Sequence, residues 1–222
     1  LTVGSRIQYS LVHTFNQYTF EPVSIIAATP LLSKLFGNKF IEGDLPSYVA
    51  GAKKIPYQIS KTVLGADLLG LRYEQLLPYA LPHERPEDAF KVIPGDFVTT
   101  EDGTGIVHTA PTFGADDAKV AAEAGVPPLL VEDENGNLVP LVDLRGKFRS
   151  ELKDEMFGFG EEYIKAEYLS EEEKSIEFEL QKERLQSIIP DLKAYLSVDE
   201  RIALKLKLEN KAFKIEKYEH SY

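Results

Sequence analysis

Hydrophobic and polar residues alternate with a period of two in several short stretches of the first half of the chain, which is typical of half-buried β-strands. In residues 6–13, Ile7, Tyr9 and Leu11 alternate with polar neighbours, so these three side chains are predicted to face the core. Further strands are predicted at 19–29 (with Pro22 near its start), at 57–65, near 90–93 and on both sides of a turn in 96–111.

Two short helices interrupt these strands. Residues 29–37 read as a helix that Thr29 caps, that has Pro30 in its first turn and that Gly37 ends. Residues 114–125 are rich in alanine and end in glycine, which predicts a second short helix.

The second half of the chain has a different pattern. Residues 127–142 predict a hairpin with a turn at Asn135–Gly136. Residues 161–210 are dense in charge and carry helical spacing, and the alternation in 211–219 fits a strand. Because short turns rather than long helices connect the early strands, we expect a β-rich α+β fold and not a doubly wound α/β sheet.

Length and composition limit the possibilities. With 222 residues, 43% of them hydrophobic, the chain can form a sizeable core, and we expect one domain over 1–222. Residues 1–150 would be its β-rich core and 151–222 a charged, more helical extension with a returning strand. The first residue is not methionine and the last residues are not a polar tail, so both ends look like cuts through a longer polypeptide.

Charge and cysteine content point away from several protein classes. The net charge of −11 weakens nonspecific attraction to nucleic acid, although a local basic patch stays possible. The absence of cysteine excludes disulfides and thiolate metal sites and fits a cytoplasmic location. No apolar run is long enough for a membrane span. The lysines near the C-terminus are either a solvated surface or a contact strip for a partner; they are Lys205, Lys207, Lys211, Lys214 and Lys217.

The stretch DGTGIVHTAPTFGADD, residues 102–117, holds the candidate chemistry. Gly103, Thr104 and Gly105 form either a tight turn or a place where a ligand approaches the backbone. No Gly-Lys-Ser/Thr follows, so the turn is not a phosphate-binding loop. His108 is either a structural residue or a proton carrier, a hydrogen-bond donor or a bulky wall, and no second histidine or cysteine stands at the spacing of a zinc site.

Asp116 and Asp117 stand at the start of the predicted helix 114–125. The helix dipole and the free N–H groups of a first turn favour carboxylates, so capping explains one of the two. A carboxylate in this place is also suited to bind an ammonium group.

At this point the sequence resembles a known family. GTGIVHTAPTFGADD is similar to the signature of the editing domain of isoleucyl-tRNA synthetase, and similar stretches include IPYQISKTVLGADLLGLRYEQLLPYA, VIPGDFVTTEDGTGIVH and ENKAFKIEKYEHSY. The resemblance covers most of the chain and is weakest at 170–200. The valyl and leucyl editing domains share the Gly-Thr-Gly turn and the later aspartate but typically lack a histidine at His108, which favours the isoleucyl family.

The resemblance implies a closed β-barrel-like domain with short peripheral helices, inserted in a synthetase and hydrolysing valine from tRNA(Ile). One missing methylene gives a binding site only ~1–3 kcal/mol of discrimination, and isoleucyl-tRNA synthetases are the standard example of this limit. By the resemblance, Asp117 holds the α-ammonium group and His108 limits the pocket volume; both are the expected catalytic-site residues. The expected substrate-binding residues are Gly103, Thr104, Gly105, Thr109, Phe113 and Asp116.

The expected chemistry is attack of water on the aminoacyl ester, with backbone N–H groups of the glycine turn near the oxyanion. No serine or cysteine nucleophile with a base stands out, so no covalent intermediate is expected. The resemblance implies no metal or cofactor in this domain, whereas ATP and Mg²⁺ act elsewhere in the parent enzyme. The expected partners are the valine-carrying acceptor end of tRNA(Ile) and the rest of the synthetase chain, with no membrane.

One feature departs from the family. A threonine-rich segment that forms the other pocket wall is expected just upstream of Leu1-Thr2-Val3-Gly4, so reduced hydrolysis by this chain is expected. Two alternatives stay open: an editing domain of a valyl- or leucyl-tRNA synthetase, or a noncatalytic insertion that docks the tRNA acceptor end.

Overall fold

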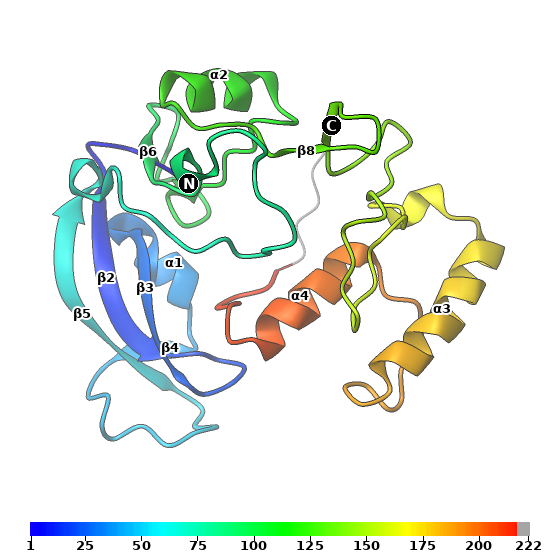
Figure 1. The fold of residues 1–222 in the computed structure, drawn as a ribbon. Helices are drawn as coiled ribbons and strands as arrows, with labels where there is room; N and C mark the ends of the chain where they lie inside the picture. Colours follow the sequence, from blue (N-terminus) through cyan, green and yellow to red (C-terminus); the bar gives the residue numbers. More distant parts are fainter. Residues whose placement is uncertain (217–222) are drawn as a thin grey trace. The chain divides into compact units, whose positions relative to one another are not determined.

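The structure, a computed structural model, describes residues 1–216 (Figure 1). The chain divides into two compact units. Unit 1 comprises Leu1–Leu76 and Glu84–Pro128, and unit 2 comprises Leu77–His83 and the described residues from Leu129 onward. Unit 1 contains most of the strands, whereas unit 2 contains the two longest helices, so the fold is mixed α+β, as predicted.

Unit 1 holds two sheets. The first has the strand order β3-β2-β5-β4, with the bounds Pro22–Ala28, Gln8–Phe15, Ile55–Leu64 and Phe40–Glu42. The second has the order β6-β1-β7, with the bounds Ile93–Pro94, Thr2–Val3 and Ile106–Val107. β1 runs parallel to β6 and antiparallel to β7. The short helices are η1 (Thr29–Leu31), α1 (Leu32–Phe36), η2 (Gly65–Leu68), η3 (Pro86–Asp88) and α2 (Ala115–Glu123). β2, β3, β5, β7, α1 and α2 correspond to predicted elements, whereas β1, β4, η2 and η3 were not predicted. Closure into a barrel stays a prediction.

The core side of β2 differs from the predicted one. Tyr9 is buried as expected, but Leu11 is half-buried, and the buried positions that follow are Ser10, Val12 and Thr14. The register with β5 shifts between Leu11 and Val12, which pair with Lys61 and Ile59, so Ser60 is an extra residue in β5. Such a bulge twists the strands locally, and a pattern of period two in one strand cannot show a bulge in its partner.

The segment 29–37 is helical, but Thr29 is not its cap. η1 begins after Ala28 with no side-chain cap, and the Thr29 hydroxyl instead lies 2.8 Å from the Ser10 hydroxyl. Pro30 stands in the first turn and Gly37 follows α1 with a φ of 50°, as predicted. The strand predicted before the glycine turn is wrong, because the N–H of Val98 bonds to the carbonyl of Gly95 in a turn.

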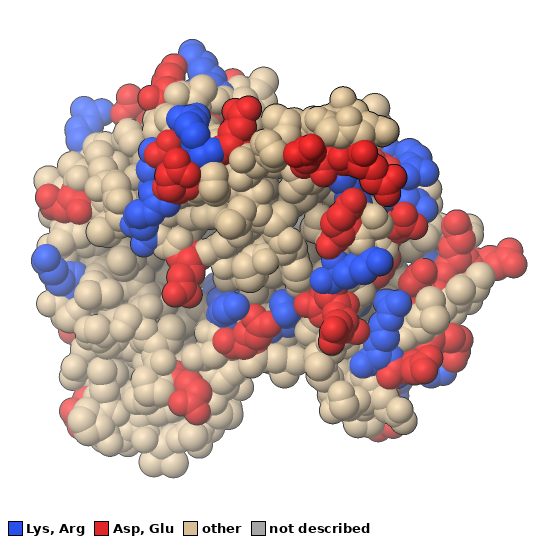
Figure 2. All heavy atoms as spheres, in the orientation of Figure 1, with Lys and Arg blue, Asp and Glu red and all other residues tan. Residues whose placement is uncertain are grey.

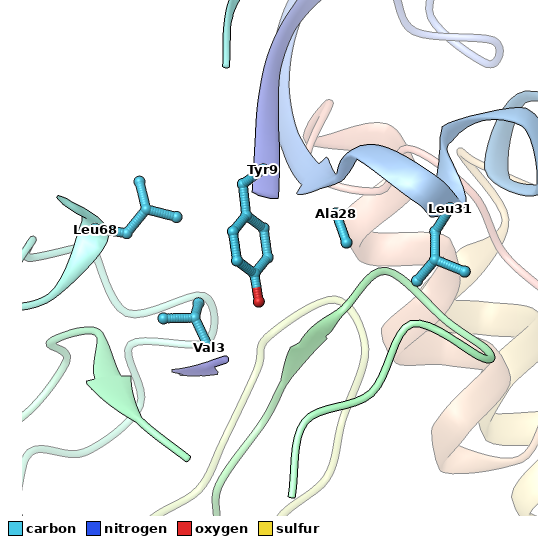
Figure 3. Packing of buried hydrophobic residues seen from close by; sticks show 5 residues of the cluster. All are labelled: Val3, Tyr9, Ala28, Leu31 and Leu68. Atoms are coloured by element: carbon cyan, nitrogen blue, oxygen red, sulfur yellow. The ribbon is translucent and has the colours of Figure 1, made fainter. Parts of the chain in front are cut away.

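The core of unit 1 lies where the two sheets meet η1 and η2. Figure 3 shows the ring of Tyr9 between Leu68 and Ala28, with its hydroxyl end toward Val3. Leu31 completes this cluster, against which Ile106 of β7 also packs. The candidate stretch 102–117 is therefore anchored to the core through Ile106.

Unit 2 combines a hairpin with helices. The hairpin strands are β8 (Leu130–Glu132) and β9 (Leu138–Pro140), and the helices are η4 (Ala166–Tyr168), α3 (Glu171–Leu185) and α4 (Val198–Leu208). The predicted Asn-Gly turn is confirmed, with Gly136 at a φ of 78°. Ser170 and Ser197 cap α3 and α4, and each forms a capping box with a glutamate three residues later. The apolar cluster of unit 2 contains Phe157, Phe159, Leu185 and Val198.

Charged side chains are dense in unit 2, where Figure 2 shows acidic and basic groups interspersed over the helices. Lys205 is not a solvated surface residue, since its ammonium group lies 3.1 Å from Asp154 and 2.6 Å from Glu209. Residues 211–216 form no strand, and the rest of the predicted returning strand, with Lys217, lies outside the described residues. None of the helices in residues 1–216 combines the length and apolar character that a membrane crossing requires.

Candidate functional site

The Gly-Thr-Gly turn requires both of its glycines. Gly103 and Gly105 have φ values of 70° and 72°, which side chains other than glycine rarely adopt. A Cβ atom on Gly105 would lie 2.4 Å from the Cβ of Ala28, so the turn packs directly on the end of β3. The carbonyl of Thr104 accepts the N–H of Ala28 at 2.8 Å. The turn is therefore a tight one that is fixed to the sheet.

One backbone N–H group of this turn already donates a hydrogen bond within the chain. The N–H of Gly103 donates to Asp102 Oδ1 at 2.8 Å. The hydrogen bond from Lys34, followed by that from Gly103, lowers the pKa of the Asp102 carboxyl. Asp102 is thus an ionised acceptor that occupies one of the N–H groups expected to stabilise an oxyanion.

His108 follows the end of β7 and is exposed. Its imidazole makes no hydrogen bond or ion pair with any residue of the described chain. The next residue, Thr109, is half-buried, and its hydroxyl lies 2.5 Å from that of Thr2, which is fully buried in β1. His108 is accordingly free to meet a ligand from solvent, while Thr109 faces the core.

Asp117 closes the loop that follows. Its Oδ2 accepts the N–H of Ala110 at 2.8 Å, and its side chain lies against Gly114, where an added Cβ would be 3.3 Å away. Gly114 precedes α2 and provides no side-chain cap, so Asp117 is in the first turn but ties down the loop instead of capping the helix. Asp116 is exposed, and Phe113, in the loop before α2, is 65% exposed.

A hollow of about 730 Å³ lies between α2 and the segment that follows β6. Asp116 and Asp117 line it together with Phe97, Lys119 and Val120. His108, Thr109 and Phe113 are not among its lining residues. The structure therefore places the two aspartates in one hollow, and a cavity shared by His108 and Asp117 stays a prediction.

Sequence inspection missed Phe97 and Lys119 as neighbours of the aspartates. Helical spacing from Asp116 to Lys119 and Val120 was visible, because positions three and four apart share a helix face. Phe97 is 49% exposed, and nothing in its local pattern indicated that the chain would bring it to α2. Within residues 1–216, no three histidines, cysteines or acidic residues come together in an arrangement that could hold a metal ion.

Comparisons with known proteins cover the whole chain. No family model matches it. The chain is 53% identical over 222 residues to an isoleucine–tRNA ligase of Cytophaga hutchinsonii, 43% identical over 228 residues to one of Bacteroides fragilis and 39% identical over 235 residues to one of Porphyromonas gingivalis. Each match includes 100% of this chain and 19% of the relative. The chain thus spans about a fifth of the length of these curated relatives.

Proposed function

Since this chain belongs to the isoleucine–tRNA ligase family, of which it matches one segment, we propose that it is the editing domain of such a synthetase. Its reaction would be hydrolysis of the ester that joins valine to tRNA(Ile). The partners would be the valine-carrying acceptor end of that tRNA and the rest of the synthetase, whose ATP and Mg²⁺ serve aminoacylation outside this segment. A closed barrel built on the two sheets of unit 1 is part of this proposal.

The observation that supports the proposal most is the geometry of Asp117. The carboxylate is half-buried in the first turn of α2 and lines a hollow. Only Oδ2 is used, by the N–H of Ala110, and Oδ1 accepts no hydrogen bond from any described residue. A fixed carboxylate with one oxygen left over is suited to an α-ammonium group, since a charged hydrogen bond of this kind is stronger than a neutral one.

The remaining roles follow from position. His108 would be a wall that limits the size of the amino-acid side chain, with Phe113 beside it, while Thr109, whose hydroxyl meets that of Thr2, would support this wall from the core side. A water molecule would attack the ester carbonyl. Because Asp102 already occupies the Gly103 N–H, the oxyanion would take its hydrogen bonds from other donors than this one.

The direct test is hydrolysis of valyl-tRNA(Ile) by a full-length synthetase that carries this segment. Replacing Asp117→Asn keeps an acceptor for the Ala110 N–H but removes the charge, and we expect at least a tenfold loss of hydrolysis (about 1.4 kcal/mol). Glu123→Gln is the matched control, because it removes another carboxylate of α2 that lines the hollow but makes no contact with the loop. Equal effects of the two variants would argue against an ammonium site at Asp117.

A second variant tests the size limit. His108→Ala should enlarge the pocket and allow hydrolysis of correctly charged isoleucyl-tRNA(Ile). If isoleucine stays protected in this variant, His108 is not the wall that excludes it.

The noncatalytic alternative, a domain that only docks the acceptor end, is favoured by one observation: His108 does not line the hollow that contains Asp117. A crystal soaked with a nonhydrolysable valyl-adenosine analogue separates the two. The editing proposal requires the ammonium group on Asp117 with the valine side chain against His108. The names of the relatives favour the isoleucyl over the valyl or leucyl family.

A further inference from the structure

The His108 imidazole is held through its backbone and not through hydrogen bonds to the ring. No described residue bonds to the ring, and the strand that carries it, β7, has only two residues. β7 pairs with another two-residue strand, β1, through Thr2 opposite Val107 and Val3 opposite Ile106. Such a short ladder fixes little by itself, so the contacts that flank His108 decide where its ring lies.

The first of these contacts is the hydroxyl of Tyr9. The whole residue is buried, and its hydroxyl donates to the carbonyl of Gly105 at 2.6 Å while it accepts the N–H of Gly4 at 3.0 Å. This hydroxyl joins the turn before β7 to the segment after β1. Figure 3 shows that it is the polar tip of an otherwise apolar cluster.

The second contact is the hydroxyl of Thr2. It is also fully buried and lies 2.5 Å from the hydroxyl of Thr109, directly after His108. The two buried hydroxyls therefore hold the chain three residues before and one residue after the imidazole. Each belongs to a residue near the start of the chain, about a hundred positions away in sequence.

We propose that Tyr9 and Thr2 are positioning residues for His108: their hydroxyls hold β7 and its flanks so that the imidazole limits the editing pocket. Both side chains are fully buried, so they would act through the backbone of β7 and not by contact with a substrate. The inference rests on the proposed editing function, but the structural part of it can be measured without any substrate. A displacement of about 1 Å at a reacting centre can reduce a rate by up to ~100-fold. Loss of either hydroxyl would let β7 shift, and a shift of this size at His108 is enough to slow hydrolysis.

Two nearly isosteric variants remove the hydroxyls, Tyr9→Phe and Thr2→Val. In the full-length synthetase, each should lower kcat for hydrolysis of valyl-tRNA(Ile) by about tenfold with little change in KM, and each should increase hydrolysis of isoleucyl-tRNA(Ile). Aminoacylation with isoleucine should stay unchanged.

Two controls separate positioning from a general loss of stability. Thr14→Val removes another buried hydroxyl, which donates to the carbonyl of Pro56 at 2.7 Å in the sheet away from the loop. Tyr57→Phe removes a hydroxyl that bonds to no described residue. Equal losses of kcat in Thr14→Val and Thr2→Val, at equal losses of Tm, would overturn the proposal.

NMR spectra of the 222-residue chain give the readout that needs no activity. The backbone amide of Val107 and the imidazole carbons of His108 should shift in Tyr9→Phe and Thr2→Val and stay unchanged in both controls. If these resonances do not move, the positioning role is wrong, whatever the kinetics show. If these resonances move while the unchanged synthetase fails to hydrolyse valyl-tRNA(Ile), the proposed editing function is wrong. The proposal that the hydroxyls of Tyr9 and Thr2 hold β7 then still stands.

Discussion

The two units of this chain differ in whether they bury charged side chains. In unit 1 the buried polar side chains are neutral, as with the hydroxyls of Thr2, Tyr9 and Thr14, which bond to a backbone carbonyl or another hydroxyl. Unit 2 buries the neutral Gln181, which bonds to the backbone of Leu196, but it also buries charge. Arg201 is 1% exposed and pairs with Glu162, and Lys205, which is 16% exposed, pairs with Asp154.

This difference has consequences for stability and for function. Neutral hydrogen bonds fix geometry with little dependence on pH, and each contributes only about 0.5–1.5 kcal/mol. A buried ion pair is costly to break, because removing one partner leaves the other charge in a medium of low polarity. Unit 1 is therefore the part where a small change of shape should affect a site, and unit 2 is the part whose stability depends on charge.

The largest effect is expected for Glu162→Ala in unit 2. Arg201 also donates to the carbonyl of Phe157 and lies over the ring of Phe159, so it cannot leave the core when Glu162 is gone. Loss of one partner of a buried pair costs about 3–5 kcal/mol. Urea denaturation followed by far-UV circular dichroism should show this loss, since α3 and α4 give most of the helical signal.

Glu171→Ala is the control for this variant, because its pair with Lys174 lies at the surface and should be dispensable. A loss of less than about 1 kcal/mol in Glu162→Ala would mean that the charges of unit 2 are solvated, and the contrast between the units would disappear.

The next largest effect is expected in unit 1, from geometry instead of charge. Gly105→Ala would place a Cβ 2.4 Å from that of Ala28 at a φ of 72°, so strain and overpacking together should cost about 3 kcal/mol. Gly103→Ala has a similar φ but no atom within 4 Å of the added Cβ, so only the backbone strain of roughly 1–2 kcal/mol remains. Equal losses of stability in the two variants would show that the contact with Ala28 does not hold the turn.

A smaller effect should appear on acidification, and it should be largest in unit 2, because Asp102 of unit 1 is exposed whereas Asp154 of unit 2 is mostly buried. Burial pushes the pKa of Asp154 upward, but hydrogen bonds from the Phe157 N–H, the Tyr79 hydroxyl and Lys205 outweigh it, so the pKa lies below its usual value. A carboxyl with a lowered folded-state pKa contributes stability that is complete above its unfolded pKa of about 3.9 and that is lost as the pH falls through the folded value.

NMR spectra recorded from pH 6 to pH 2 measure this loss for each unit separately. The resonances of Tyr79 and Lys205 should lose their native shifts before those of Tyr9 and Thr2. Asp154→Asn should reduce this difference, because asparagine does not titrate. If both sets of resonances lose their native shifts at the same pH in the unchanged chain, the predicted difference between the units is wrong.

Local features of the fold were predictable because their causes are local. Gly125 follows the end of α2 and Asn135–Gly136 forms the hairpin turn, and each of these needs only a few neighbouring residues. The core side of β2 was not predictable, since it depends on a bulge opposite, in β5.

The candidate site shows the same limit. The stretch 102–117 identified the turn and the aspartate that ties the loop, because all of these lie within sixteen residues. The hydroxyls of Thr2 and Thr109 meet although the two residues are 107 positions apart. The residues around Thr2 in the sequence give no sign of this contact. Arg201 and Glu162 likewise pair across 39 positions, so helical spacing alone could not show that the chain buries a guanidinium group here.

The smallest effect is expected for the cap of α4, and it tests how the charges of unit 2 are held. The Ser197 hydroxyl accepts the N–H of Glu200 at 3.3 Å, and Ser197→Ala should cost about 1 kcal/mol, as is usual for a lost cap. Ser170→Ala at α3 is the matched control, with the same capping box at a helix that carries no buried charge pair. If the cap acts only on its own helix, urea denaturation should give the same loss for both variants. A clearly larger loss in Ser197→Ala would mean that the first turn of α4 also sets the position of Arg201, four residues later. The cap and the buried ion pair of unit 2 would then be coupled and would not contribute to stability separately.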